Sequence, residues 1–159
     1  MRKVHWLRVI LLGTGLIVSA VRFELLAQDQ FKIVKEWKGG FSGVDKPAQV
    51  VIRDAKTWAD WWDKVHSRVI PKPELPEVDF TKHMVVAVFM GMRSTGGYAI
   101  RITDVRWDKA KDKLQILVQE ISPAPGAIVT QALTQPYHIV VIPRTEKTVE
   151  FILEKITGK

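Results

Sequence analysis

Residues 84–90 read Met84-Val-Val-Ala-Val-Phe-Met90, an uninterrupted apolar run. The run is β-branched in part and has no polar position that would mark a solvent face, which is typical of a central strand buried on both faces. Periodicity alone also allows a short buried helix, so that alternative stays open at this point.

The segments around this run favour a β fold because most of them alternate between apolar and polar residues. In residues 99–107 the apolar phase slips, and a β-bulge near Thr103-Asp104 would explain the slip. Short strands with turns between them predict a mainly β protein, an antiparallel β-sandwich or partly open barrel of about seven strands with one short amphipathic helix. The other predicted strands are 31–37, 49–53, 114–118, 137–142 and 149–153.

One segment has helical periodicity. Trp58, Trp61, Trp62 and Val65 fall at i, i+3, i+4 and i+7, which places them on a single apolar stripe. Thr57 is predicted to cap the helix with its hydroxyl. The three tryptophans of the stripe differ in expected burial. Trp58 and Trp62 are predicted to lie in the core, and Trp61 is predicted to lie at the edge of the stripe.

Composition fits a single globular domain. The chain has 159 residues, 47% of them hydrophobic, a net charge of +7 and no cysteine. A chain without cysteine has no disulfides, no thiol nucleophile and no cysteine-ligated metal. A basic excess can indicate a nucleic-acid or membrane partner, so its location along the chain matters.

The first 27 residues resemble a secretory signal. A basic start is followed by the uncharged run 9–21 and then by Ala27, after which we expect cleavage, with Ala20 as the second choice. An uncleaved membrane anchor is the alternative. Four of the 24 basic residues and one of the 17 acidic residues lie in this segment, which leaves a net charge of +4 for the rest. We therefore expect a single domain over residues 28–159 that is exported to the periplasm or the cell exterior.

Motifs for chemistry are weak in this sequence. No histidine has a flanking nucleophile signature, and no metal-ligand spacing occurs, so we predict no catalytic residues, no metal site and no cofactor. Glu77-Val-Asp79 could pair two carboxylates, but two surface acids are the simpler interpretation. The basic cluster 109–113 is offset by Asp108 and Asp112 and indicates a solvated hairpin tip, so we expect no nucleic-acid partner.

Two loops rich in glycine and proline remain as candidates for binding another protein. They are Gly91-Met-Arg-Ser-Thr-Gly-Gly-Tyr98 and the long connection 122–137. Paired glycines allow close backbone approach, and tyrosine and proline provide rigid contact surface. The alternative is that Thr130, Gln131 and Tyr137 brace the long loop internally. The predicted binding residues are Ser94, Thr95, Gly96, Gly97, Tyr98, Thr130, Gln131, Thr134, Pro136 and Tyr137.

At these loops the sequence resembles the PrcB C-terminal domain family, whose first members are accessory subunits of a bacterial surface protease complex. The similarity covers residues 84–151 and rests on Val85-Val-Ala-Val-Phe-Met-Gly91, Ser94-Thr-Gly-Gly-Tyr98, Ser122-Pro-Ala-Pro-Gly126, Val129-Thr-Gln-Ala-Leu-Thr-Gln-Pro-Tyr137 and Ile142-Pro143. It implies a secreted or lipid-anchored, non-catalytic protein, which in some members of the family is needed to stabilise a partner protease. Because the chain has no cysteine, a lipid anchor is not carried over.

The motif Ser94-Thr-Gly-Gly-Tyr98 is also similar to a loop of chagasin-type protease inhibitors, which are β-sandwiches as well. Two functions follow as hypotheses. The first is a secreted accessory or stabilising partner of an extracytoplasmic protease, and the second is a peptidase inhibitor that acts through the same loops.

Overall fold

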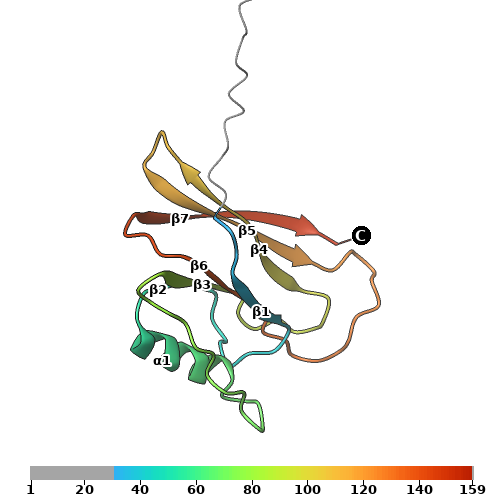
Figure 1. The fold of residues 1–159 in the computed structure, drawn as a ribbon. Helices are drawn as coiled ribbons and strands as arrows, with labels where there is room; N and C mark the ends of the chain where they lie inside the picture. Colours follow the sequence, from blue (N-terminus) through green and yellow to red (C-terminus); the bar gives the residue numbers. More distant parts are fainter. Residues whose placement is uncertain (1–30, 159) are drawn as a thin grey trace, which may run out of the picture.

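The computed structural model describes residues 31–158, which form two packed β-sheets and one helix (Figure 1). The predicted leader, residues 1–27, lies outside the described residues. Mainly β architecture in two sheets, with seven strands and one helix, confirms the predicted sandwich. The elements are β1 (Lys35–Gly39), β2 (Ala48–Ile52), α1 (Ala55–Val65), β3 (His83–Phe89), β4 (Ala99–Asp108), β5 (Lys113–Ser122), β6 (Tyr137–Pro143) and β7 (Thr148–Thr157).

The larger sheet has the strand order β1-β6-β3-β2, and every pairing in it is antiparallel. Strand β3 lies inside this sheet and contains residues 84–89 of the apolar run; Met90 follows its last residue. Its residues alternate between two cores, because side chains of a strand point to opposite faces in turn. Met84, Val86 and Val88 pack between the two sheets, whereas Val85, Ala87 and Phe89 pack toward α1. Burial on both faces explains why the run has no polar position, and the strand assignment is confirmed.

The smaller sheet has the order β4-β5-β7. The register of β4 against β5 shifts between Ile102 and Asp104, which confirms the predicted bulge. Strand β7 runs parallel to β5, unlike the antiparallel pairings expected from the sequence. Between β5 and β7 the chain forms β6 in the opposite sheet. It therefore reverses direction twice, and β7 runs in the same direction as β5.

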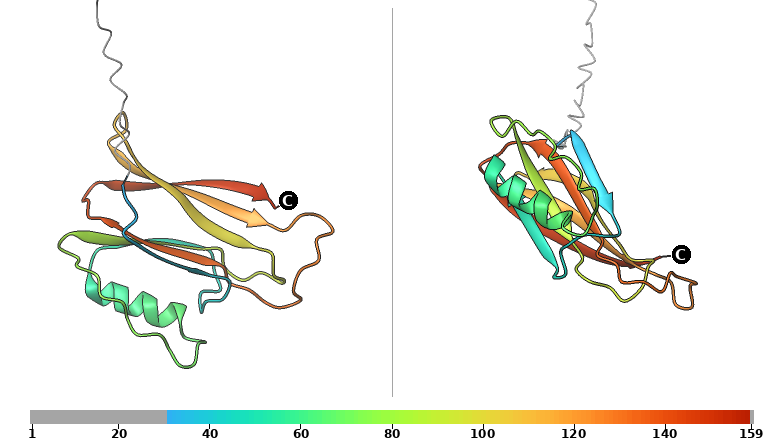
Figure 2. Two further views of the ribbon diagram at one scale, coloured as in Figure 1. Left: turned by 45° about the vertical axis from the view of Figure 1, so that its right-hand side comes forward. Right: turned by 90° about the horizontal axis from the view of Figure 1, so that it is seen from below.

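The helix covers the outer face of the larger sheet (Figure 2). Trp58, Trp62 and Val65 are buried, and Trp61 is partly exposed and stacks on Phe89 with ring centroids 5.2 Å apart. These placements agree with the predicted stripe. No helix among residues 31–158 is long and apolar enough to cross a membrane.

Two predicted boundaries are wrong. The N-cap is Asp54, whose Oδ1 accepts a hydrogen bond from the Thr57 N–H at 2.8 Å, so Thr57 lies inside the first turn. Asp54 has extended backbone geometry, and this lets its carboxylate reach the free N–H groups of the first turn. Strand β1 begins at Lys35 rather than at Phe31, because Phe31 bonds to the Val105 carbonyl of the other sheet.

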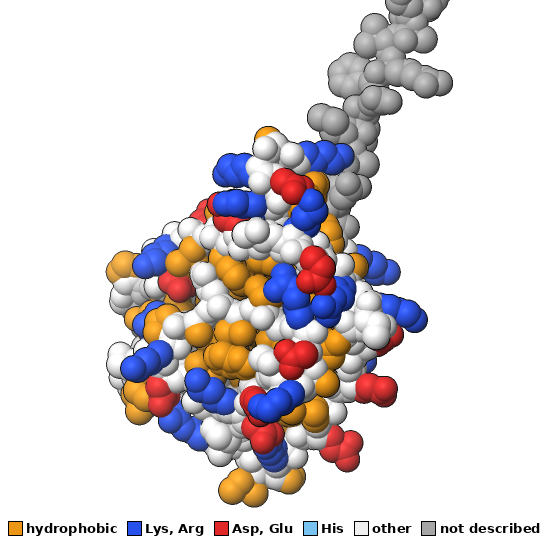
Figure 3. Space-filling view, turned by 90° about the vertical axis from the view of Figure 1, so that its left-hand side faces the viewer, with side chains coloured by type: hydrophobic (Ala, Val, Ile, Leu, Met, Phe, Trp, Pro, Cys, Tyr) orange, Lys and Arg blue, Asp and Glu red, His pale blue; other side chains and the backbone are white. Residues whose placement is uncertain are grey.

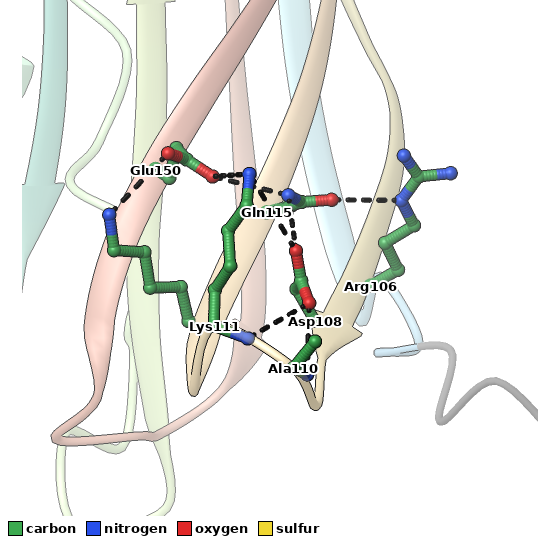
Figure 4. A network of polar contacts seen from close by, with 7 residues as sticks. Arg106, Asp108, Ala110, Lys111, Gln115 and Glu150 are labelled. Carbon is green, nitrogen blue, oxygen red and sulfur yellow. Dashed lines mark hydrogen bonds and ion pairs between the residues drawn. The ribbon is translucent and has the colours of Figure 1, made fainter.

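A polar network closes the tip of the β4–β5 hairpin against β7 (Figure 4). The buried amide of Gln115 donates to Asp108 and to Glu150 and accepts from Arg106, at 2.9, 3.1 and 3.2 Å. Lys111 forms ion pairs with Asp108 and Glu150. Lys111 of the basic cluster 109–113 is therefore neutralised by acids of the same fold. This agrees with the prediction that the cluster forms a solvated hairpin tip.

Positive and negative side chains are intermixed over the face drawn in Figure 3. Hydrophobic side chains lie between them near the middle of that face. A mixed distribution of charge is what a net charge of +4 over residues 28–159 leads one to expect.

Candidate functional site: a loop-lined end of the sandwich

The two loops predicted from the sequence lie against each other. Arg93 and Thr134 exchange backbone hydrogen bonds of 2.8 and 3.0 Å, and the Gly96 N–H donates to the Thr130 carbonyl at 2.8 Å. The Thr134 hydroxyl donates to the Thr95 carbonyl, also at 2.8 Å. These bonds join segments that are separated by about forty residues along the chain, and they fix the loops as one unit.

The ten predicted residues divide into an inner and an outer group. Thr134 and Pro136 are buried and hold the loops together. Gly96 and Gly97 lie at the contact itself: a Cβ on Gly97 would stand 2.8 Å from Val129 and 2.9 Å from Pro123. The outer group has exposed or half-buried side chains and is available to a partner: Ser94, Thr95, Tyr98, Thr130, Gln131 and Tyr137.

Two further segments, 40–47 and 66–73, join this unit. Gly40 accepts a hydrogen bond from the Gln135 N–H at 2.7 Å, and the carbonyl of Asp45 accepts from the Met92 N–H at 3.0 Å. The Asp45 carboxylate binds both terminal nitrogens of Arg68, at 2.9 and 2.7 Å. Arg68 lowers the pKa of Asp45, chiefly through these hydrogen bonds, and so favours the charged pair.

We call these four segments, 40–47, 66–73, 91–98 and 123–136, the loop end of the domain; residues 74–78 run back along α1, where Pro76 accepts a hydrogen bond from Trp58, and leave the loop end. Figures 1 and 2 show it at the opposite end of the sandwich from the β4–β5 hairpin tip.

The loop end carries most of the large hydrophobic side chains that are exposed among residues 31–158. Ten such side chains are exposed, and six of them lie on these four segments: Phe41, Val69, Ile70, Met92, Ile128 and Leu133. A concentration of this kind indicates an interaction surface, whereas scattered exposed hydrophobics need no explanation.

Sequence reasoning missed Phe41, Met92 and Leu133. Phe41 lies between glycine and serine in a segment that reads as a turn, and a large apolar residue there is the signal that could have identified it.

A cavity of about 220 Å³ opens beside Phe41. It is lined by the apolar side chains of Val65 and Val69 together with Phe41, and by Ser42, Arg68 and Gln135. A cavity of this size with apolar walls can accept one bulky side chain of a partner.

His138 links the two sheets next to the loop end. Its Nδ1 accepts a hydrogen bond from the Ile102 N–H at 2.8 Å, and its Nε2 lies 3.1 Å from the Glu36 carboxylate. Because Nδ1 accepts, the neutral ring carries its proton on Nε2 and donates it to Glu36. Burial lowers the pKa of His138, and the hydrogen bond with Glu36 opposes this effect without cancelling it.

This arrangement predicts that the domain loses stability as the pH falls below about 6.5, the ordinary pKa of histidine. The unfolded chain binds a proton at His138 in that range, whereas the folded chain does so only at lower pH, so the free energy of unfolding decreases with falling pH. Urea unfolding at pH 7.5, 6.5 and 5.5 measures this slope. The variant His138→Leu is less stable at pH 7.5, because the buried Ile102 N–H loses its acceptor. It also has a shallower slope than the natural chain, and equal slopes would contradict the assignment.

The other two histidines of the described part are placed differently. His66 ends α1 and its Nδ1 lies 3.0 Å from the Trp62 carbonyl, as the predicted helix terminus requires. His83 lines a cavity of about 260 Å³ with Glu77 and Asp79. Within residues 31–158, no three His, Cys, Asp or Glu side chains come together as metal ligands would.

Fold and site together define a β-sandwich whose loop end concentrates exposed hydrophobic side chains. Comparison with protein families confirms the resemblance found in the sequence: residues 84–143 match the family described as PrcB C-terminal. The match runs from β3 through β6 and includes both predicted loops, and it indicates a protease-complex-associated domain. No curated protein and no solved structure matches the chain significantly.

Proposed function

We propose that this chain is an exported, non-catalytic binding domain that acts as an accessory or stabilising partner of an extracytoplasmic protease. The observation that carries the proposal is the joining of the two family loops with two other segments into one end that exposes six large hydrophobic side chains. The family match supports a protease as the partner. Export rests on the leader-like sequence of residues 1–27.

The chemistry of the loop end suits association with a protein. The segment 121–137 contains no charged residue, so little charge has to be desolvated when a partner covers it. Hydrogen bonds within the loops hold them in place before binding, which limits the entropy lost on association. Phe41 and Leu133 are 64% and 57% exposed, and large side chains of this kind dominate the binding energy of many interfaces.

The test is recovery of partners by the affinity-tagged full chain expressed in its own cell. We expect a peptidase among the recovered proteins, and at least about tenfold less of it with the double variant Phe41→Ser, Leu133→Ser. The matched control is Val34→Ser, Ile152→Ser, which removes two exposed hydrophobics outside the loop end and should retain the partner. Failure to recover any specific partner, or equal loss with both double variants, would overturn the proposal.

A second measurement separates a stabilising partner from an inhibitor that uses the same loops. Purified chain is added to the recovered peptidase, and both its turnover and its half-life during incubation are followed. A stabilising partner lengthens the half-life and leaves turnover intact. Loss of turnover at stoichiometric chain would assign the inhibitor function instead.

A further inference from the structure

A groove lies beside the loop end, where the two sheets do not match in width. The larger sheet has four strands and the smaller one has three. Strand β4 packs against β6 and β3, and β1 is the edge strand of the larger sheet next to β6. The groove in this corner has a volume of about 270 Å³ and is lined by Lys38, Gly39, Gly40, Tyr98, Ala99, Ile100, Arg101 and Tyr137.

One wall of the groove is the edge of β4 that faces away from β5. The N–H of Ile102 points toward this edge, because it donates to His138. Backbone groups two residues apart in a strand point the same way, so the N–H and C=O of Ile100 face the groove. The same edge is already occupied further along, where the Phe31 N–H donates to the Val105 carbonyl. The open stretch of edge is therefore short.

The groove is also cationic. Arg101 lines it, and the guanidinium of Arg93 lies 5.7 Å from the ring centre of Tyr98, which lines it too. Neither arginine forms an ion pair with an acid among residues 31–158.

Two acids belong to the strands that flank the groove-lining residues, Glu36 to β1 and Glu120 to β5. Glu36 is already bound by Lys38 and His138, at 2.9 and 3.1 Å. Glu120 pairs with Ile100 from β5, and it does not line the groove. Arg101, which lines the groove, and Arg93, which lies against the ring of Tyr98, therefore have no negative partner of their own.

We propose that this groove binds the carboxyl terminus of a partner protein. The last residues of the partner would extend along β4, pair with the backbone of Ile100, and place the terminal carboxylate against Arg101 and Arg93. Addition of a strand to an open edge and capture of a terminal carboxylate are both established ways of binding peptides. A chain end suits the site better than an internal segment, because the open edge is short and is closed at one side by the His138 contact. This inference rests on the proposed function and names the part of the partner that is recognised.

The test uses three peptides of one length and the folded full chain labelled with ¹⁵N. The first is acetyl-Ala-Val-Thr-Val-Val with a free terminal carboxylate, the second is the same peptide with a terminal amide, and the third is acetyl-Ala-Val-Asp-Val-Val-amide. We expect the first peptide to shift the amide resonances of Gly40, Tyr98 and Ile100 and to bind about tenfold more tightly than the other two. One lost charge-assisted pair corresponds to a change of about that size.

Substitution of the cations is the matched control. Arg101→Gln should abolish the preference for the free carboxylate, whereas Lys155→Gln, which removes an exposed lysine on β7, should keep it. Equal binding of the free acid and the amide would overturn recognition of a carboxylate, and tighter binding of the aspartate peptide would overturn the chain end in favour of an acidic strand. If the partner recovered by the natural chain is also recovered by Arg101→Gln but not by the loop double variant, the groove inference fails while the proposed function stands.

Discussion

Replacing Trp58 by alanine is expected to lower the free energy of unfolding by about 3–5 kcal/mol, the usual cost of removing a large buried aromatic side chain. Trp58 is 2% exposed and packs against the rings of Trp37 and Trp62, with centroids 5.7 and 5.2 Å away. Its indole N–H also donates to the carbonyl of Pro76 at 2.9 Å. The substitution therefore opens a cavity and releases the connection that leads from α1 to β3.

Urea unfolding followed by circular dichroism measures the effect, and a constant slope against urea shows that stability alone has changed. Trp61→Ala is the matched control on the neighbouring position of the same helix. Trp61 is partly exposed and packs on Phe89, so we expect a loss of about 1–2 kcal/mol. Equal losses for the two variants would contradict the assignment of Trp58 to the core.

Gly97→Ala is expected to separate the two family loops and to destabilise the loop end by about 2–4 kcal/mol. Gly97 has a φ of 83°, which costs a residue with a side chain about 1–2 kcal/mol. Its Cβ would also overlap Val129 and Pro123, and overpacking of this kind typically costs about 1–3 kcal/mol. Amide hydrogen exchange of Gly96 and Thr134, whose N–H groups bond across the loops, should become faster.

Gly126→Ala isolates the contribution of the positive φ from that of the Cβ overlap. Gly126 also has a positive φ, of 78°, but nothing lies within 4 Å of the position of its Cβ. This variant should lose only about 1–2 kcal/mol and keep the slow exchange of Gly96 and Thr134. Rapid exchange in both variants would show that the loops are held by the conformation of the long loop and not by their mutual contact. In that case the partner should bind the two variants equally weakly.

The features of this fold that depend on residues close together in the sequence could be predicted from the sequence. The run 84–90 identifies a strand covered on both faces, because each face of β3 meets its own core. The slip of apolar phase at Thr103-Asp104 marks the bulge, since a bulge moves the following side chains to the other face. The stripe of Trp58, Trp62 and Val65 identifies the helix and its buried side.

The boundaries were less predictable. Asp54 and Thr57 are both suitable capping residues, and the choice between them depends on where the extended backbone ends. Residues 31–34 alternate as a strand would, but the Phe31 N–H bonds to Val105 in the other sheet. Alternation shows which residues face a core and does not show which neighbour takes the backbone hydrogen bonds.

The candidate site, too, could be predicted only in part. The glycine- and proline-rich composition of the two loops, and their resemblance to a family, selected the residues around Thr95 and Thr134. Neither observation could show that these residues bond to each other. Phe41 was missed because its loop joins the site through Gly40 and Gln135, which are far apart in the chain.

The sequence by itself therefore determined the class of fold, the buried central strand and the pair of loops, since these follow from local patterns of polarity and backbone freedom. Only the tertiary structure decided that β7 runs parallel to β5, that four loops form one apolar end, and that a cationic groove lies between β1 and β4. The physical reason is that each of these features depends on contacts between segments distant in the chain, and such contacts are set by the packing of the whole sandwich.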